Sequence, residues 1–149
     1  MGTRFVMNSG LAGQGLEVAV GFAADRSGAG VAYAAVRTAE NERSLRVPFR
    51  VRRTDMVEER EVPYGALRAV AGAVRRDWHG PVRFLVGDAA LVADLSERRP
   101  LPGALTMPYV ALRCCLNRFT AADVAHSTGP LIDDLTARAK AEVSLRVAA

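Results

Sequence analysis

Residues 85–95 read LVGDAALVADL, and the way these residues fold decides how the second half of the chain is interpreted. A short apolar run ends at Gly87 and Asp88, and an amphipathic segment begins directly afterwards. This order predicts a buried strand over residues 82–87 and a short helix over residues 89–98. Asp88 then stands where a carboxylate caps the free N–H groups of a helix. A carboxylate at such a position can also hold a metal ion, so both roles have to be considered.

Three strands are expected before this stretch, joined by short turns that favour an antiparallel arrangement. They cover residues 16–24, 30–38 and 44–53. In the third strand Leu45, Val47 and Phe49 alternate with arginines, which predicts one buried and one exposed face. Pro48 lacks an N–H group and therefore indicates an edge strand.

The remaining elements alternate between helix and strand. Apolar residues at helical spacing predict a helix over residues 63–78, and YVALRCCL at residues 109–116 is expected to be the fifth strand. A last helix is expected from about residue 127 onwards, after a loop. The predicted order is β-β-β-α-β-α-β-α, which is an α/β fold with a mixed five-stranded sheet covered by helices.

The chain has 149 residues, half of them hydrophobic, which is enough for one core without disulfides or metal ions. Residues 1–15 are small, polar and rich in glycine and are expected to be a flexible lead-in, so residues 16–149 form a single domain. No apolar run is long enough to cross a membrane, and no signal peptide is recognised. We therefore expect a cytoplasmic protein without a membrane partner. The adjacent Cys114 and Cys115 are expected to be buried reduced thiols.

The net charge of +4 favours a partner that carries phosphate groups. Lys140 is the only lysine, so the many arginines also reflect a compositional preference. The third strand places Arg46, Arg50 and Arg52 on one face. These arginines are a candidate nucleic-acid-binding surface, because arginine contacts phosphates without reading sequence. A solvated face is the alternative interpretation.

Two common classes of chemistry find no support. The chain has no glycine-rich phosphate loop of the Walker type and no Gly-x-Ser-x-Gly elbow. Nucleotide hydrolysis on a P-loop and acyl transfer by an α/β-hydrolase are therefore excluded.

The element order resembles that of the ribonuclease H superfamily, and four segments carry the resemblance. They are AGVAYAAVR, PYGALRAVAGAV, VGDAALVADL and IDDLTARA, which resemble the second strand, the first long helix, the fourth strand with its following helix, and the last helix. The resemblance spans about residues 16–143 and implies a ribonuclease H-like fold. It also implies the chemistry of the family, in which carboxylates hold two Mg²⁺ or Mn²⁺ ions that hydrolyse the RNA of an RNA–DNA hybrid.

Only two of the four acidic positions of the family carry a carboxylate in this chain. Asp88 matches the acid that ends the fourth strand, and Asp133 matches the acid of the last helix. The first-strand position falls on Gly21 and the first-helix position falls on Pro63. Neither of these residues can ligate a metal ion through its side chain.

Asp25, in the turn after the first strand, and Glu61, just before the first helix, are the candidates to complete the site. Either would reach it only if the backbone differs from that of the family. The retained acids have structural alternatives, because Asp88 can be a helix cap and Asp133 an acid favoured by the dipole of a first helical turn. His126, in the expected loop, does not have the spacing of the mobile histidine of the family.

We therefore expect a ribonuclease H-like domain with an incomplete acidic metal site, inactive or weak as a catalyst. It would act as a nucleic-acid-binding or scaffolding module on an RNA–DNA hybrid or another duplex. One alternative is an active nuclease that uses Mg²⁺ or Mn²⁺ to cleave RNA–DNA hybrids. A second alternative is a protein-interaction domain that forms a homodimer and carries no chemistry. Enzymatic activity stays open, with the inactive form favoured because two carboxylates hold two metal ions poorly.

Overall fold

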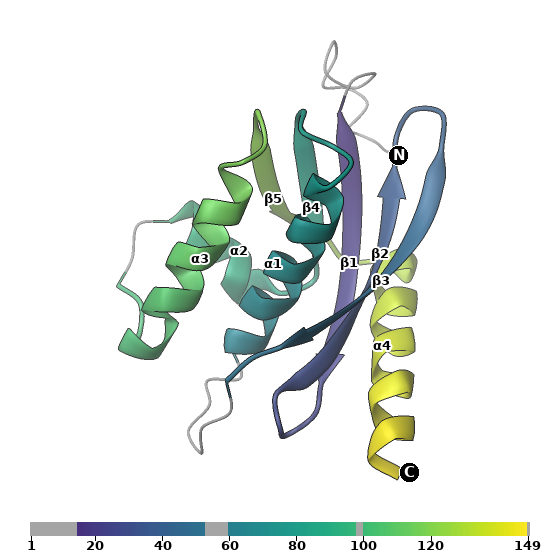
Figure 1. Cartoon of the computed structure of the whole chain (residues 1–149), viewed down its shortest axis with the longest axis vertical. Helices are drawn as coiled ribbons and strands as arrows, with labels where there is room; N and C mark the ends of the chain where they lie inside the picture. Colours follow the sequence, from purple (N-terminus) through teal and green to yellow (C-terminus); the bar gives the residue numbers. More distant parts are fainter. Residues whose placement is uncertain (1–14, 53–59, 98–99, 149) are drawn as a thin grey trace.

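A five-stranded sheet with helices on both faces organises the chain (Figure 1). The computed structural model describes residues 15–52, 60–97 and 100–148. The elements, in chain order, are β1 (Leu16–Ala24), β2 (Ala29–Arg37), β3 (Glu42–Arg50), α1 (Glu61–Arg75), β4 (Val82–Val86), α2 (Ala89–Ser96), the short 3-10 helix η2 (Gly103–Leu105), α3 (Thr106–Leu116), β5 (Ala122–His126) and α4 (Pro130–Ala148). The expected lead-in, residues 1–15, lies outside the described residues apart from Gly15.

The strands lie in the order β3-β2-β1-β4-β5, and both kinds of pairing occur. β1 pairs antiparallel with β2, and β2 pairs antiparallel with β3. β4 is parallel to β1, and β5 is parallel to β4. The predicted mixed sheet is therefore confirmed. β3 is an edge strand, as Pro48 indicated, since a proline at an edge leaves no central ladder bond unmade.

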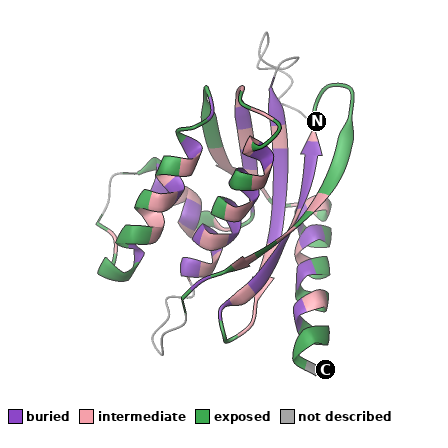
Figure 2. Ribbon diagram, in the orientation of Figure 1, coloured by how far each residue is buried: buried purple, intermediate pink, exposed green. Residues whose placement is uncertain are grey.

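The two faces of β1 pack against different helices. Val18 and Val20 belong to the larger core, which they share with Leu67 of α1 and with residues of α2 and α3. Ala19, on the opposite face, packs against Leu135 of α4. Figure 2 shows the buried residues concentrated on β1, on β2 and on the inner sides of the helices. Because the residues of β1 that face α4 are small, this single helix lies close to the sheet.

Helix α1 has the apolar face that its spacing predicted. The side chains of Tyr64, Leu67, Val70 and Val74 are buried against the sheet. Pro63 lies in the first turn, where its missing N–H group costs no helical hydrogen bond. In the described parts of the chain, no helix combines the length and the apolar character that a membrane span requires.

The position of the fifth strand was predicted wrongly. Residues 109–116 belong to helix α3, in which Leu112 and Leu116 are buried one turn apart. The fifth strand is β5, in the segment that was expected to be a loop. The described residues therefore contain one more α-helix than predicted. The cysteines were consequently misplaced as well, because Cys114 is exposed and Cys115 half-buried on α3, although both are free thiols.

Candidate active-site pocket

An open pocket of about 490 Å³ lies where β4 and β5 end and α4 begins. Parallel strands present their carboxyl ends at the same edge of a sheet, and the Ser127 N–H group donates to the Val86 carbonyl at 2.8 Å to join the two ends. The polar residues that line the pocket are Asp88, Ser127, Thr128, Asp133, Thr136 and Lys140. Val20 and Phe22 of β1 form part of its apolar wall. The pocket thus brings a strand end, a loop and a helix face together.

Asp88 both caps α2 and lines this pocket. Its backbone is extended, and its Oδ1 accepts a hydrogen bond from the Leu91 N–H group at 2.8 Å. The predicted helix cap is therefore confirmed, and one carboxylate oxygen is engaged in it. Such a cap satisfies one of the N–H groups that a first helical turn leaves without a helical partner.

Asp133 also lines the pocket, from the first turn of α4. Its side chain is exposed, and its N–H group donates to the Gly129 carbonyl at 3.0 Å. An acid in a first turn interacts favourably with the helix dipole. The fold therefore places Asp88 and Asp133 around one space, although they stand far apart in the sequence.

Gly21 explains why no carboxylate comes from β1. It lies in the middle of this strand and faces α4. A Cβ atom at Gly21 would lie 2.3 Å from the backbone nitrogen of Thr136 and 2.6 Å from the carbonyl carbon of Leu135. Those distances are far below van der Waals contact, and the atoms are backbone atoms that cannot rotate away. The backbone of α4 therefore fills the space that a first-strand carboxylate would need.

Asp25 does not line the pocket and has a structural role in the turn between β1 and β2. Its Oδ1 accepts hydrogen bonds from the Ser27 hydroxyl at 2.6 Å, the Ser27 N–H group at 2.8 Å and the Ala29 N–H group at 3.2 Å. The hydroxyl of Ser27, followed by the two N–H groups, holds the pKa of Asp25 below its usual range. Asp25 follows Phe22, the nearer of the two β1 residues in the pocket wall, by three positions, roughly 10 Å at the rise of a strand.

Glu61 also lies away from the residues that line the pocket. It is the first residue of α1 and is only 8% exposed. Its Oε2 is 4.0 Å from Nε of Arg52. His126 ends β5 with an exposed side chain and is not among the residues that line the pocket. Neither Asp25 nor Glu61 therefore completes an acidic cluster with Asp88 and Asp133.

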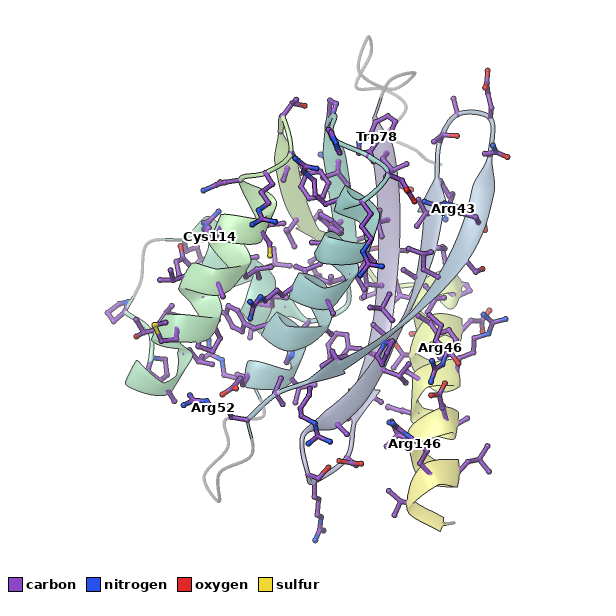
Figure 3. The ribbon with its side chains drawn as sticks, viewed as in Figure 1. Arg43, Arg46, Arg52, Trp78, Cys114 and Arg146 are labelled. Carbon is purple, nitrogen blue, oxygen red and sulfur yellow. The ribbon has the colours of Figure 1, made fainter. Side chains whose placement is uncertain are left out.

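Arg46 of the predicted arginine row is bound to α4 rather than free for a ligand. Its Nε donates to Oε1 of Glu142 at 2.9 Å, and a second guanidinium nitrogen contacts Oε2. The Tyr33 hydroxyl donates to the same carboxylate at 2.5 Å. The Arg46 guanidinium first, and then the Tyr33 hydroxyl, lower the pKa of Glu142 to about 2. Figure 3 shows Arg46 beside α4, the helix that also carries Arg146.

The other two arginines of the row also have partners within the protein. Arg50 donates to the carbonyl of Ser27 at 3.4 Å, and Arg52 lies beside Glu61. Arg52 nevertheless keeps 70% of its side chain exposed. Arg46 and Arg50 therefore attach the edge strand to its neighbours, and Arg52, which follows the strand, stays largely exposed.

Lys140 is the residue of the pocket that the sequence analysis missed. It follows Asp133 by seven positions, which places both residues on the same face of α4. Helical spacing was therefore a usable signal, but the lysine was considered only as part of the composition. Thr136 lies between them on this face, and it too was missed.

The described residues do not fit a two-metal centre. Among them, no group of three or more His, Cys, Asp or Glu side chains could hold a metal ion. The pocket offers the carboxylates of Asp88 and Asp133, one of them partly engaged as a cap, together with the ammonium group of Lys140. Magnesium requires about six oxygen ligands, and a two-metal centre requires several shared carboxylates.

No protein-family model matches the chain, and no curated protein matches its sequence. Solved structures do match. Ribonuclease H1 from the halophilic archaeon Halobacterium salinarum shares 14% sequence identity at a TM-score of 0.70, covering 87% of this chain and 96% of the archaeal one. The N-terminal ribonuclease H domain of a Mycobacterium tuberculosis protein shares 17% sequence identity at a TM-score of 0.64. This match covers 84% of this chain and 98% of the other chain.

A third match is LC9-RNase H1, described as a type 1 ribonuclease H with the type 2 active-site motif. It shares 12% identity at a TM-score of 0.65 and covers 87% of this chain and 72% of its own. Likeness at such low identity concerns the arrangement of the elements and does not extend to their chemistry. The element order, the mixed sheet and these matches agree, and the chain has the ribonuclease H fold.

Proposed function

We propose that the chain is a nucleic-acid-binding module with the ribonuclease H fold that does not perform two-metal hydrolysis. The observation that carries this proposal is the contact between Gly21 and the backbone of α4. It removes the space for a carboxylate in the middle of β1. Nucleic acid is supported as the partner by the names of the solved structures that share the fold and by the net charge of +4.

The binding surface that we propose lies on α1 and the end of α3 and is called the α1 stripe (Arg68, Arg76 and Arg118). Arg68 on α1 and Arg76, the residue directly after α1, are both exposed and stand about two helical turns apart. Between them lies Gly72, where a Cβ atom would meet nothing within 4 Å, so the surface between them is unobstructed. The carbonyl of Arg118 accepts a hydrogen bond from Nε of Arg75 at 3.1 Å, which attaches this end of α3 to α1.

The α1 stripe differs from the arginine row of β3 in having no acidic partners. Within the described part of the chain, the side chains of Arg68, Arg76 and Arg118 form no ion pair, whereas Arg46 is held by Glu142. An unpaired arginine contacts a phosphate without first losing an internal partner. The α1 stripe is therefore the better site for a duplex backbone.

Fluorescence anisotropy with a labelled RNA–DNA hybrid and a labelled DNA duplex, across a series of salt concentrations, tests this proposal. We expect the double variant Arg68→Gln/Arg76→Gln to weaken binding and to lower the salt slope by about two, one for each phosphate contact. The matched control is Arg46→Gln/Arg50→Gln, which removes the same charge from β3 and is expected to keep the slope. Absence of affinity for both duplexes at low salt would overturn the proposal.

Active hydrolysis is the second candidate, because Asp88 and Asp133 do line one pocket. Incubation of a labelled hybrid with Mg²⁺ and, separately, with Mn²⁺ separates the two functions. We expect the hybrid to stay intact with either ion. Cleavage that disappears in Asp88→Asn would establish a nuclease, since asparagine keeps the helix cap but loses the charge.

Self-association is favoured by a different observation, the exposed apolar side chains on α3. Met107 is 70% exposed and Val110 is 45% exposed, one turn apart. Sedimentation equilibrium measures whether this face joins two copies. A stable dimer that binds neither duplex would replace the nucleic-acid proposal by a protein-interaction function.

A further inference from the structure

The pocket at the ends of β4 and β5 contains its own positive charge. Asp88 and Asp133 contribute two carboxylates, and Lys140 contributes an ammonium group. Carboxylates that share a pocket favour a nearby cation, whether this is a metal ion or a side chain. In the residues described, Lys140 is the sole cationic side chain among those that line the pocket.

The position of Lys140 on α4 directs its side chain towards the acids. Side chains on a helix lean towards its N-terminus, and Asp133 lies two turns in that direction on the same face. Two turns correspond to about 10 Å along the helix axis. The long side chain of lysine covers part of this distance, in the direction of Thr136 and Asp133. The ammonium group can therefore extend into the space between Asp133 and the end of β4.

Lys140 has no competing acidic partner. Among the residues that the structure describes it forms no ion pair, with Asp88 and Asp133 included, whereas Arg46 on β3 is paired with Glu142 of the same helix. The side chain of Lys140 is also exposed, so its stem is not confined by packing. Its charge thus remains available to the pocket.

From the shared lining of this pocket we propose that Lys140 is its resident cation and that the ammonium group excludes divalent metal ions from Asp88 and Asp133. The inference rests on the proposed absence of a two-metal centre from this pocket. It is independent of whether the protein binds nucleic acid. A third carboxylate cannot come from β1, because α4 lies against Gly21. The lysine then reduces the attraction of the two remaining carboxylates for a doubly charged ion.

The test is a titration with Mn²⁺ alone, in which electron paramagnetic resonance measures the free ion. We expect Lys140→Gln to bind Mn²⁺ about fivefold or more tightly than the wild type, because a charge within several ångströms of the ion is removed. Lys140→Glu adds a third carboxylate to the pocket and should bind Mn²⁺ still more tightly. Far-UV circular dichroism of each variant verifies that the fold is retained.

The matched control is Arg138→Gln, which removes one positive charge from α4 at a residue that does not line the pocket. Its affinity for Mn²⁺ should equal that of the wild type. Adding Asp133→Asn to Lys140→Gln should abolish the gain, which locates the ion in the pocket. Equal affinity of Lys140→Gln and wild type, absence of binding by both, or a gain that survives Asp133→Asn would each overturn the inference. Cleavage or loss of nucleic-acid binding, measured separately, would instead overturn the proposed function.

Discussion

Two glycines in this chain show how strongly the surroundings of one residue decide the effect of a methyl group. Gly21 contacts the backbone of α4, whereas a Cβ atom at Gly72 on the exposed side of α1 meets nothing within 4 Å. We predict that Gly21→Ala lowers the free energy of unfolding by about 1–3 kcal/mol or more, because the helix must move away. Gly72→Ala should raise it by about 1 kcal/mol, because alanine favours a helix more than glycine does.

Urea denaturation of both variants measures these free energies. The opposite signs are the essential result, because each variant is the control for the other. A stable Gly21→Ala protein would show that α4 can withdraw from β1, and the explanation for the missing carboxylate would then be wrong.

Two substitutions of Asp88 separate the stabilisation that comes from capping α2 from the stabilisation that comes from the negative charge. Asp88→Ala should lower the free energy of unfolding by about 1 kcal/mol, since the Leu91 N–H group loses its acceptor. Asp88→Asn should leave it nearly unchanged, because asparagine caps helices equally well. Thermal denaturation of the two variants provides the comparison, and equal losses in both would mean that the carboxylate charge, rather than the cap, stabilises α2.

At the scale of elements, an ion pair between a buried carboxylate and a partly exposed arginine attaches α2 to α1. Asp94 of α2 has a fully buried side chain that accepts hydrogen bonds from Arg60 at 2.7 and 2.5 Å and from the Tyr64 hydroxyl at 2.8 Å. Burial, followed by the hydrogen bond to Asp94, raises the pKa of Tyr64, so this residue remains a donor. The carboxylate thus has donors from the residue before α1 and from its first turns.

Removing this carboxylate should destabilise the protein. We predict a loss of about 1–3 kcal/mol for Asp94→Ala, because the Tyr64 hydroxyl and the partly exposed Arg60 guanidinium then lack their acceptor. Tyr64→Phe, which leaves the ion pair in place, should lose only about 1 kcal/mol. Chemical denaturation of the two variants tests the order, and a larger loss in Tyr64→Phe would assign the stabilisation to the hydroxyl instead.

The elements that were predicted correctly have a pattern that continues over many residues. The alternation of Leu45, Val47 and Phe49 with arginines has one interpretation, and so does the helical spacing from Tyr64 to Val74. The run YVALRCCL is shorter, and its apolar residues suit either a strand or a buried helix. Pro108, in the first turn of α3, was the available signal for a helix, because proline is tolerated there.

The short strand β5 could not be predicted from its own residues. It has five residues, three of them exposed, because it forms the second edge of the sheet. Its strand conformation comes from pairing with β4, and this pairing is a tertiary interaction that local propensity does not contain. Because β5 was not predicted, the pocket residues Ser127 and Thr128, which follow directly after it, were not predicted either.

At the scale of the whole molecule, Glu142 links the last helix to the β2–β3 hairpin. Its carboxylate accepts hydrogen bonds from Arg46 of β3 and Tyr33 of β2. The pKa of Glu142 is lowered from 4.5 to about 2, first by Arg46 and then by Tyr33. A depressed pKa in the folded state means that the stabilisation is complete above pH 4.5 and is lost as the pH falls towards 2.

We therefore predict that Glu142→Gln is less stable than the wild type at neutral pH and that the difference decreases steadily below pH 4.5. Urea denaturation of both proteins at a series of pH values measures this difference. The comparison removes the contribution of all other carboxylates, which titrate in both proteins. A difference that is independent of pH would show that the Arg46 contact does not depend on charge.

The cover that α4 provides for β1 and β2 has a consequence for synthesis on the ribosome. Ala19 and Ala35 are buried by Ile132 and Leu135, yet β2 ends at Arg37 and α4 begins only at Pro130. At ordinary translation rates the hairpin leaves the exit tunnel on the order of ten seconds before its covering helix. Over that interval one side of the nascent sheet has no intramolecular partner. Chains arrested after α3 should therefore be bound by chaperones and cut rapidly by proteases, and chains arrested beyond α4 should be resistant.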